Sequence, residues 1–430
     1  MAPRRPKKSK KSYYQKMFEI EALEPKLLLS AAPIEAPNYV APDNNQFIQE
    51  DVNYNTNARE LDLSASLADL TYLVNQNGDI SIGTGAYSLS EDGTFDFANG
   101  SLLEFENVRN ILGSKGDDTF VFAEDFLLED FVLADEPDFD FSIWGGEGND
   151  ELVVLGADSI WYITGPDSGY VGDIEFSEIE NLTGGPDNTD TFVFTPSGSM
   201  SGAIEGGAEG FDILELDGGE YDSVTYTAFD PHSGTVERVY SDGHNDIITY
   251  SGLEPIYDNT STSSRVIGLS NNNDYDAILR TEADGKFTVS GSTFEGITFS
   301  NPSESLTIQG LEGEDSLIIN TIDMGSTDFR VEVENIYLSA GQTISGTGNI
   351  ELIAASQDSS QITQTDQLQE KHSLIQIEGS IITTGDTTLS ATAERDINIE
   401  SSSGFSSVEL TGSSSAKVEI RTGAVLTAAG

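Results

Sequence analysis

The chain has 430 residues, with 74 Asp and Glu against 20 Lys and Arg, so its formal net charge at pH 7 is −54. Binding to nucleic acid or to an anionic membrane surface depends on basic side chains that neutralise phosphates, and this charge opposes both partners. The sequence contains no cysteine, which excludes disulfide bonds, thiolate zinc sites and cysteine nucleophiles. No window approaches the roughly 18 apolar residues of a membrane helix, so we predict no membrane span.

Basic residues are concentrated at the N-terminus. Residues 1–26 carry a net charge of +5 from eight basic and three acidic side chains, whereas residues 27–430 carry −59 from 12 basic and 71 acidic ones. We predict a disordered basic segment over 1–36 and a linker rich in Asn and Pro over 37–60. The string FEIEALEPKLLLSAAP, starting at Phe18, resembles the LEPR-XLL segment of very large bacterial surface or secreted repeat proteins, with Lys26 in place of the arginine. That resemblance implies that 1–36 is a targeting or processing element on an exported protein, secreted or at the cell surface, and that a long repetitive body follows it.

The acidic body contains an internal repeat. FENVRNILGSKGDDTFVF from Phe105 and FSEIENLTGGPDNTDTFVF from Phe176 align with an offset of 71 residues that grows to 72 after one insertion. Each copy has an alternating β segment, a Gly/Asp loop and a compact apolar strand. The loop GGEGNDELV, from Gly145, fits G-G-x-G-x-D-x-U-x at every defined position, where U is a large apolar residue. Weaker copies of the loop start at residues 113, 184, 206 and 310, and SDGHNDIITY near Asp246 is the weakest.

This nonapeptide resembles the RTX calcium-binding repeat. Glycine in such a loop permits left-handed backbone angles, the Asp supplies an anionic oxygen, and the apolar residue two positions later points into the core. In the family's β-roll the nonapeptides run in tandem, whereas here the copies start 22 to 104 residues apart, so complete sites require loops from different turns to stack. The alternative is a metal-free Gly/Asp turn between two strands. The candidate ligands for structural Ca²⁺ are Asp117, Asp118, Gly145, Gly148, Asn149, Asp150, Asp190, Asp212, Asp246, Gly310, Gly313 and Asp315.

The remaining pattern indicates short strands. The segments 182–219, 248–256 and 305–320 look similar to modules that form parallel β-solenoids in giant bacterial repeat proteins, and period-two alternation continues to residue 420. We therefore predict a mainly β fold, a right-handed parallel β-solenoid or β-helix with interspersed RTX-like Gly/Asp loops. The expected parts are RTX-like repeats over 61–256, further β repeats with one loop over 257–326, and β-helix coils over 327–430.

The sequence also predicts two short helices and one acidic loop. Weak helical spacing marks 58–70 and 123–133, and the acidic run at 135–140 predicts a solvated loop with incidental affinity for calcium. No cap for a solenoid is recognisable before Gly430, so we expect a fragment of a longer protein.

These features predict the N-terminal part of a large calcium-binding surface protein, an adhesin or a stalk, in which calcium bridges acidic loops after export. Its partners are expected to be calcium and, beyond that, host or matrix glycans or proteins. A β-helical polysaccharide lyase or hydrolase is the alternative from another class, but only eleven basic residues follow residue 60, and carboxylate pairs are too abundant to be informative. The three histidines lie far apart in the sequence, and we predict that the protein is not an enzyme. A metal-free structural spacer remains a third possibility.

Overall fold

The computed structural model describes residues 53–55, 58–75, 79–84, 87–89, 95–97, 103–106, 108–122, 141–156, 158–355 and 373–392, and the strands at 396–400, 407–411, 415–420 and 425–428. All of them belong to the unit Ala41–Gly430. The predicted basic segment 1–36, most of the linker, the helix expected over 123–133 and the acidic run at 135–140 lie outside the described residues.

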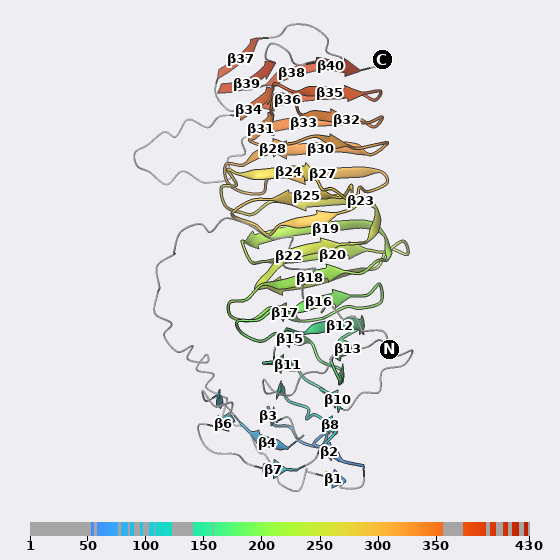
Figure 1. Cartoon of the computed structure of the whole chain (residues 1–430), viewed down its shortest axis with the longest axis vertical. Coiled ribbons are helices and arrows are strands. Elements are labelled where there is room, and N and C mark those ends of the chain that lie inside the picture. The colour runs from blue at the N-terminus through green and yellow to red at the C-terminus, as the bar shows by residue number, and fades with distance from the viewer. Residues whose placement is uncertain are drawn as a thin grey trace, which may run out of the picture. The chain divides into compact units, whose positions relative to one another are not determined.

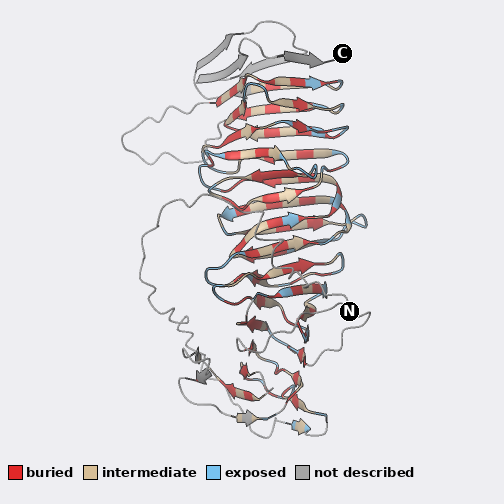
Figure 2. Ribbon diagram, in the orientation of Figure 1, coloured by how far each residue is buried: buried red, intermediate tan, exposed pale blue. Residues whose placement is uncertain are grey.

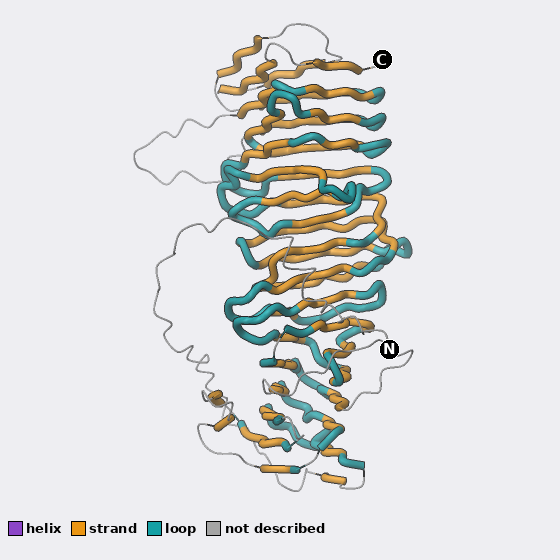
Figure 3. Tube along the Cα trace, in the orientation of Figure 1, coloured by secondary structure: helices purple, strands orange, loops and turns teal. Residues whose placement is uncertain are grey.

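The fold is mainly β, as predicted, and short strands alternate with loops along the described residues (Figure 3). The first sheet consists, in order of pairing, of β1 (Asn53–Asn55), β2 (Glu60–Asp62), β8 (Asn110–Leu112), β10 (Phe141–Trp144), β14 (Ile174–Ser177), β13 (Ser168–Val171), β12 (Ile160–Gly165), β16 (Thr191–Phe194), β18 (Asp212–Leu216), β22 (Leu253–Asp258), β26 (Ile297–Phe299), β25 (Phe287–Ser290), β24 (Ala277–Thr281), β28 (Ser316–Ile319), β31 (Asn335–Leu338), β34 (Ser373–Ile377), β39 (Ser415–Ile420) and β37 (Asp396–Glu400).

The second sheet consists of β7 (Leu103–Phe105), β4 (Ile80–Gly83), β3 (Thr71–Val74), β9 (Thr119–Phe122), β11 (Glu151–Val154), β15 (Asn181–Thr183), β17 (Ala203–Glu205), β21 (Asn245–Ser251), β20 (Ser233–Val239), β19 (Glu220–Asp230), β23 (Ser261–Gly268), β27 (Ser305–Gln309), β30 (Asp328–Val333), β33 (Ile350–Ala355), β36 (Thr387–Thr392) and β38 (Ser407–Thr411). A third sheet holds β29 (Ile322–Asp323), β32 (Thr343–Ser345), β35 (Ser380–Thr383) and β40 (Val425–Ala428), and β5 (Tyr87–Leu89) pairs with β6 (Phe95–Phe97).

Most strands pair in parallel with a strand from the previous turn of the chain. The chain passes from β8 in the first sheet to β9 in the second, then to β10 in the first and β11 in the second. Ser142 of β10 is in register with Asn110 of β8, and Glu151 of β11 is in register with Thr119 of β9, an offset of 32 residues in each case. We call such a turn of the chain a rung, and Figure 1 shows successive rungs lying one above another.

Among the described strands, four antiparallel meanders, which the sequence pattern did not predict, interrupt this parallel pairing. They are β3–β4–β7 and β19–β20–β21 in the second sheet, and β12–β13–β14 and β24–β25–β26 in the first sheet. In chain order the meanders alternate between the two sheets. After the meander β12–β13–β14, the last strand β14 pairs in parallel with β10, and the first strand β12 pairs in parallel with β16.

From Ile322 onward the chain visits three sheets in each rung. It runs from β31 in the first sheet to β32 in the third and β33 in the second before β34 returns to the first. In this part the register offset between neighbouring rungs varies: it is 21 residues between β30 and β33, where Phe329 is opposite Ile350, and 37 between β33 and β36, where Ile350 is opposite Thr387.

Buried side chains form one continuous core that extends from Leu61 to Leu389 (Figure 2). The strand sequence produces this core because alternate side chains point to opposite faces; in β33 the residues Ile350, Leu352 and Ala354 are buried, and their neighbours are half-buried. Stacking the rungs in register therefore aligns apolar side chains of one rung with those of the next.

Aromatic residues stack between neighbouring rungs at these inward positions. The rings of Tyr72 and Phe120 lie parallel with centroids 4.5 Å apart, and those of Trp161 and Phe192 lie parallel at 5.3 Å. Both pairs occupy registered positions of parallel strands. Such contacts contribute about 0.5–1.5 kcal/mol each beyond the area they bury.

The helix expected over 58–70 is wrong. Leu61 and Leu63 are buried at strand-like spacing, β2 starts this segment, and the remainder is a loop. The Ser66 hydroxyl accepts a hydrogen bond from Ala68 N, a local turn that competes with helix formation. Within the described residues, no helix has the length and apolar character needed to cross a bilayer.

Candidate cation-binding loops

The five predicted Gly/Asp loops each connect the first and second sheets. The loops that begin at Gly113 and Gly145 lead from the first sheet to the second, and those that begin at Gly184, Gly206 and Gly310 lead from the second to the first. The repeating unit is thus a strand, a Gly/Asp loop and a second strand, and its first strand belongs to the first sheet in some copies and to the second sheet in others.

The first glycine of each loop makes room for the carboxylate of its own loop. A Cβ on Gly113 would lie 2.8 Å from Oδ2 of Asp118, and a Cβ on Gly206 would lie 2.7 Å from Oδ2 of Asp212. Any larger residue there would force the buried carboxylate or the backbone to move. The aspartates that end the loops are at most 1% exposed: Asp118, Asp150, Asp190, Asp212 and Asp315.

In the loops that begin at Gly145 and Gly310, the fourth residue is a glycine in the left-handed backbone region. The φ angles of Gly148 and Gly313 are +141° and +125°, which confirms the conformational role expected for these two glycines. A Cβ on Gly148 would also meet the carbonyl oxygen of Gly116 in the neighbouring loop. Glycine at this position therefore lets adjacent loops approach closely.

The buried aspartates bind the backbone of the neighbouring rung. Asp118 N donates to Oδ1 of Asp150 at 2.8 Å, and Asp150 N donates to Oε2 of Glu180 at 2.6 Å. Asp118 Oδ1 in turn accepts from Leu70 N at 2.9 Å. Each carboxylate thus satisfies the amide of the residue at the equivalent position one rung away, and we call such a series a ladder.

Two further ladders follow the same rule. In the second ladder, Asp190 N donates to Asp212 Oδ1 at 2.7 Å, and Ser159 N donates to Asp190 Oδ1 at 2.9 Å. In the third ladder, Asp274 N donates to Asp315 Oδ1 at 3.0 Å. The ladders comprise Leu70, Asp118, Asp150 and Glu180 in the first; Ser159, Asp190 and Asp212 in the second; and Asp274, Asp315 and Glu334 in the third.

Sequence reasoning missed Glu180 and Glu334, which end the first and third ladders. Asp315 N donates to Glu334 Oε2 at 2.9 Å, as Asp150 N does to Glu180. The signal that identifies both is a Glu-Asn pair before an apolar residue: Asn181 and Leu182 follow Glu180, and Asn335 and Ile336 follow Glu334. In both places the asparagine N–H bonds the carbonyl of the ladder aspartate below it.

Sequence reasoning also missed Asp274, because its loop, SNNND, has no glycine. The signal was serine four positions before the aspartate. Ser270 Oγ donates to Asp274 Oδ1 at 2.8 Å, and Ser114 Oγ donates to Asp118 Oδ1 at 2.9 Å.

Burial makes the ladder aspartates weaker acids than an exposed aspartate. It raises the pKa of Asp118 and Asp315 to about 8, that of Asp150 to about 7 and that of Asp212 to about 6, against hydrogen bonds that lower it. Burial likewise raises the pKa of the other two ladder aspartates. Among the described residues, no ladder aspartate forms an ion pair with a basic side chain.

Two of these carboxylates have an oxygen without a hydrogen-bond partner. Oδ2 of Asp150 and Oδ2 of Asp274 are both buried and unpaired. The side chains of Asp274 and Asp315 also lie close enough to hydrogen-bond each other when one of them is protonated. A proton or a cation would satisfy these positions.

Asp117 and Asn149, also predicted as ligands, are exposed and lie on the solvent side of the first ladder. Asn149 N donates to Oδ1 of Asp117 at 2.9 Å, which links the same two rungs at the surface, with the donor on the later rung and not on the earlier one as in the ladder. Both residues line a shallow groove of about 260 Å³ that also presents the carboxylates of Glu151 and Glu205.

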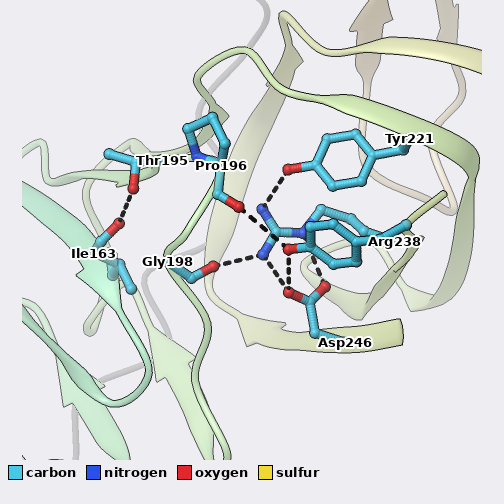
Figure 4. Close-up of polar contacts among 8 residues, drawn as sticks. Ile163, Thr195, Pro196, Gly198, Tyr221, Arg238 and Asp246 are labelled. Carbon is cyan, nitrogen blue, oxygen red and sulfur yellow. Dashed lines mark hydrogen bonds and ion pairs between the residues drawn. The ribbon is translucent and has the colours of Figure 1, made fainter. Parts of the chain in front are cut away.

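Asp246 lies outside the ladders. It is in β21, where Arg238 Nε and Nη2 donate to its two oxygens at 2.9 and 2.6 Å, and Tyr240 Oη donates at 2.9 Å (Figure 4). The Arg238 side chain is fully buried and also donates to the Gly198 carbonyl at 2.6 Å. Asp246 therefore serves as the counter-ion of a buried arginine.

Searches of family models, of curated proteins and of solved structures found no match to this chain.

Proposed function

We propose that this chain is a β-solenoid segment in the body of a large exported surface protein, acting as a stalk or adhesin and not as an enzyme. The parallel register of successive rungs and the continuous core support the solenoid, since each rung buries its apolar face on its neighbours. The LEPR-XLL-like and RTX-like strings of the sequence support export.

The observation that carries the proposal is the set of three ladders. In each ladder a carboxylate of one rung accepts a hydrogen bond from a backbone N–H of the neighbouring rung. Acidic residues therefore contribute directly to the stacking of the rungs. A body that stacks in this way extends by adding rungs, as a stalk requires.

We further propose that calcium binds within the ladders. Buried carboxylates of like charge, without basic partners, repel one another when ionised, and a divalent cation relieves that repulsion. The two unpaired oxygens, Asp150 Oδ2 and Asp274 Oδ2, are the positions that fit a cation best. Folding would then be coupled to export, since a chain of this charge stays loose where calcium is scarce and stacks where it is plentiful.

A metal-free spacer is the second candidate, and the ladders supply an observation in its favour. Both carboxylate oxygens of Asp118 and of Asp190 already accept hydrogen bonds from N–H or hydroxyl donors. These two aspartates stabilise the stack without a cation.

Thermal unfolding of the full chain at pH 7.5, with millimolar calcium and with EDTA, separates the two candidates. Calcium within the ladders predicts a higher melting temperature in calcium, and a smaller gain in Asp150→Asn and Asp274→Asn variants. An unchanged melting temperature of the wild-type chain would reject calcium and leave the spacer.

A further inference from the structure

Three side chains far apart in the sequence meet beside the third meander. His232 is in the turn between β19 and β20, Glu254 is in β22, and Glu295 precedes β26. A ring nitrogen of His232 and one carboxylate oxygen from each glutamate all lie within 4.8 Å of one another. His232 Nδ1 is 3.2 Å from Glu254 Oε2.

The backbone pairing brings these residues together. Ser233 of β20 is opposite Ser251 of β21, so the turn that holds His232 lies next to the short link from β21 to Glu254. Ile256 of β22 is opposite Ile297 of β26, and Glu254 and Glu295 each precede their registered isoleucine by two residues. The convergence is thus a consequence of strand register, not of loop flexibility.

Glu295 is a buried carboxylate that forms no ion pair among the described residues. Its side chain is 6% exposed, and its one hydrogen bond among the described residues comes from the adjacent Gly296 N, at 2.8 Å to Oε1. Burial, together with the nearby Glu254 carboxylate, raises the pKa of Glu295 to about 8. A buried carboxylate with no basic partner is costly unless a proton or a cation satisfies it.

The other two side chains leave the cluster open to solvent. The side chains of His232 and Glu254 are 60% and 38% exposed. The turn is held in place because His232 N donates to Oδ1 of Asp230 at 2.9 Å. An ion entering from solvent would therefore meet one buried and two accessible ligands and keep positions for water.

We propose that His232, Glu254 and Glu295 form a site for a divalent transition-metal ion of the zinc class. One imidazole nitrogen and two carboxylate oxygens suit zinc, whereas calcium prefers a shell made of oxygen alone. The site differs from the ladders in residues and in ligand chemistry, and it does not rest on the calcium proposal. Its ion joins the meander of the second sheet that contains β19 to the meander of the first sheet that contains β26.

Isothermal titration of the full chain with Zn²⁺, in a buffer containing millimolar Ca²⁺, tests the site. We expect one Zn²⁺ site that calcium does not displace, and a rise of the melting temperature on its occupation. The variants His232→Ala and Glu295→Gln remove a ligand, so they should weaken that site by more than the roughly 10–100-fold loss typical of an outer-shell partner.

His244→Ala is the matched control, because His244 also lies in a hairpin turn beside an aspartate, Asp242, but is not part of a three-ligand cluster. It should bind Zn²⁺ as the wild-type chain does. Substitution of Co²⁺ gives a second readout, since the position and intensity of its visible absorption depend on coordination geometry and ligand field, both of which change when His232→Ala removes the imidazole ligand.

Absence of a Zn²⁺ site in the wild-type chain would overturn the proposal, as would equal losses in His232→Ala and His244→Ala. Far-ultraviolet circular dichroism checks that each variant folds, and Glu295→Gln keeps the side-chain volume while removing a buried charge. Calcium-dependent melting can fail or succeed independently of either result.

Discussion

The backbone N–H of Asp118 donates a 2.8 Å hydrogen bond to the carboxylate of Asp150, a residue at the same position of the next rung and 32 residues further along the chain. Asp150 is fully buried. Its carboxylate therefore holds two rungs together at the point where each rung enters the second sheet.

Removing this carboxylate should destabilise the stack. Asp150→Ala leaves the Asp118 amide buried without an acceptor, at a cost of about 1–3 kcal/mol for an unsatisfied donor. Urea unfolding followed by circular dichroism measures the effect. Asp222→Ala, at an exposed position of β19, is the control and should unfold like the wild-type chain. Equal stability of the two variants would contradict a structural role for the ladder.

The pH dependence of stability should run opposite to that of most acidic proteins. The ladder pKa values of about 6 to 8 exceed the ordinary aspartate value of 3.8, so the folded state binds protons more tightly than the unfolded chain. This contribution is fully present below about pH 4 and is lost as the pH rises through 6 to 8.

In EDTA we therefore expect a lower melting temperature at pH 8.5 than at pH 5.5. Exposed carboxylates are already ionised at pH 5.5, so the carboxylates that change charge over this interval are the buried ones. Asp150→Asn keeps an oxygen acceptor but has no charge, and should show a smaller decrease over the interval; Asp222→Asn should keep the full decrease. A melting temperature that rises with pH in EDTA would refute the assignment.

The first glycine of a loop should tolerate no side chain. Gly206→Ala would bring a Cβ within 2.7 Å of Asp212 Oδ2 and against the carbonyl oxygen of Gly252. Overpacking of this kind costs about 1–3 kcal/mol or more. Gly243→Ala is the comparison, because Gly243 has a φ of +86° but open space around it, so only backbone strain of about 1–2 kcal/mol applies. Thermal unfolding should rank Gly206→Ala as the less stable variant.

The buried pair of Arg238 and Asp246 should be replaceable only as a unit. Arg238→Met leaves Asp246 without its counter-ion, and losing one partner of a buried pair costs about 3–5 kcal/mol. The double variant Arg238→Met with Asp246→Leu should recover much of that loss. Chemical unfolding of the single and double variants gives the coupling, and additive losses would show that the two residues act independently.

The loops and their buried aspartates were predictable because glycine spacing, the acid and the following apolar residue are local signals. The pairing of the loops was not, since the spacing between rungs varies from 19 residues, as between Asp315 and Glu334, to 48, as between Leu70 and Asp118. Glu180 belongs to the first ladder through its rung and not through a loop of its own. The Glu-Asn pair that marks Glu180 is recognisable as a signal only once the stacked structure pairs Glu180 with Asp150.

The meanders escaped prediction for a different reason. The alternation of β20, with Val236 and Arg238 pointing inward, has the same period of two in an antiparallel hairpin as in a parallel strand. The pattern alone does not distinguish the two pairings. The convergence of His232 with Glu254 and Glu295 depends on that antiparallel register, so the histidines gave no sign of it in the sequence.

The meander β12–β13–β14 also determines the order in which the chain can assemble. The strand that covers β10 is β14, which is reached only after β12 and β13 have passed beyond it. A chain that folds from its N-terminal end cannot pair β12 with β10, which is the exposed edge of the sheet at that stage. Pairing resumes only when the chain up to Ser177 is available, and then β14, β13 and β12 join the sheet together. Assembly at this meander, and likewise at β19–β20–β21 and β24–β25–β26, therefore advances in a block, with pauses during which the edge of the previous rung stays uncovered.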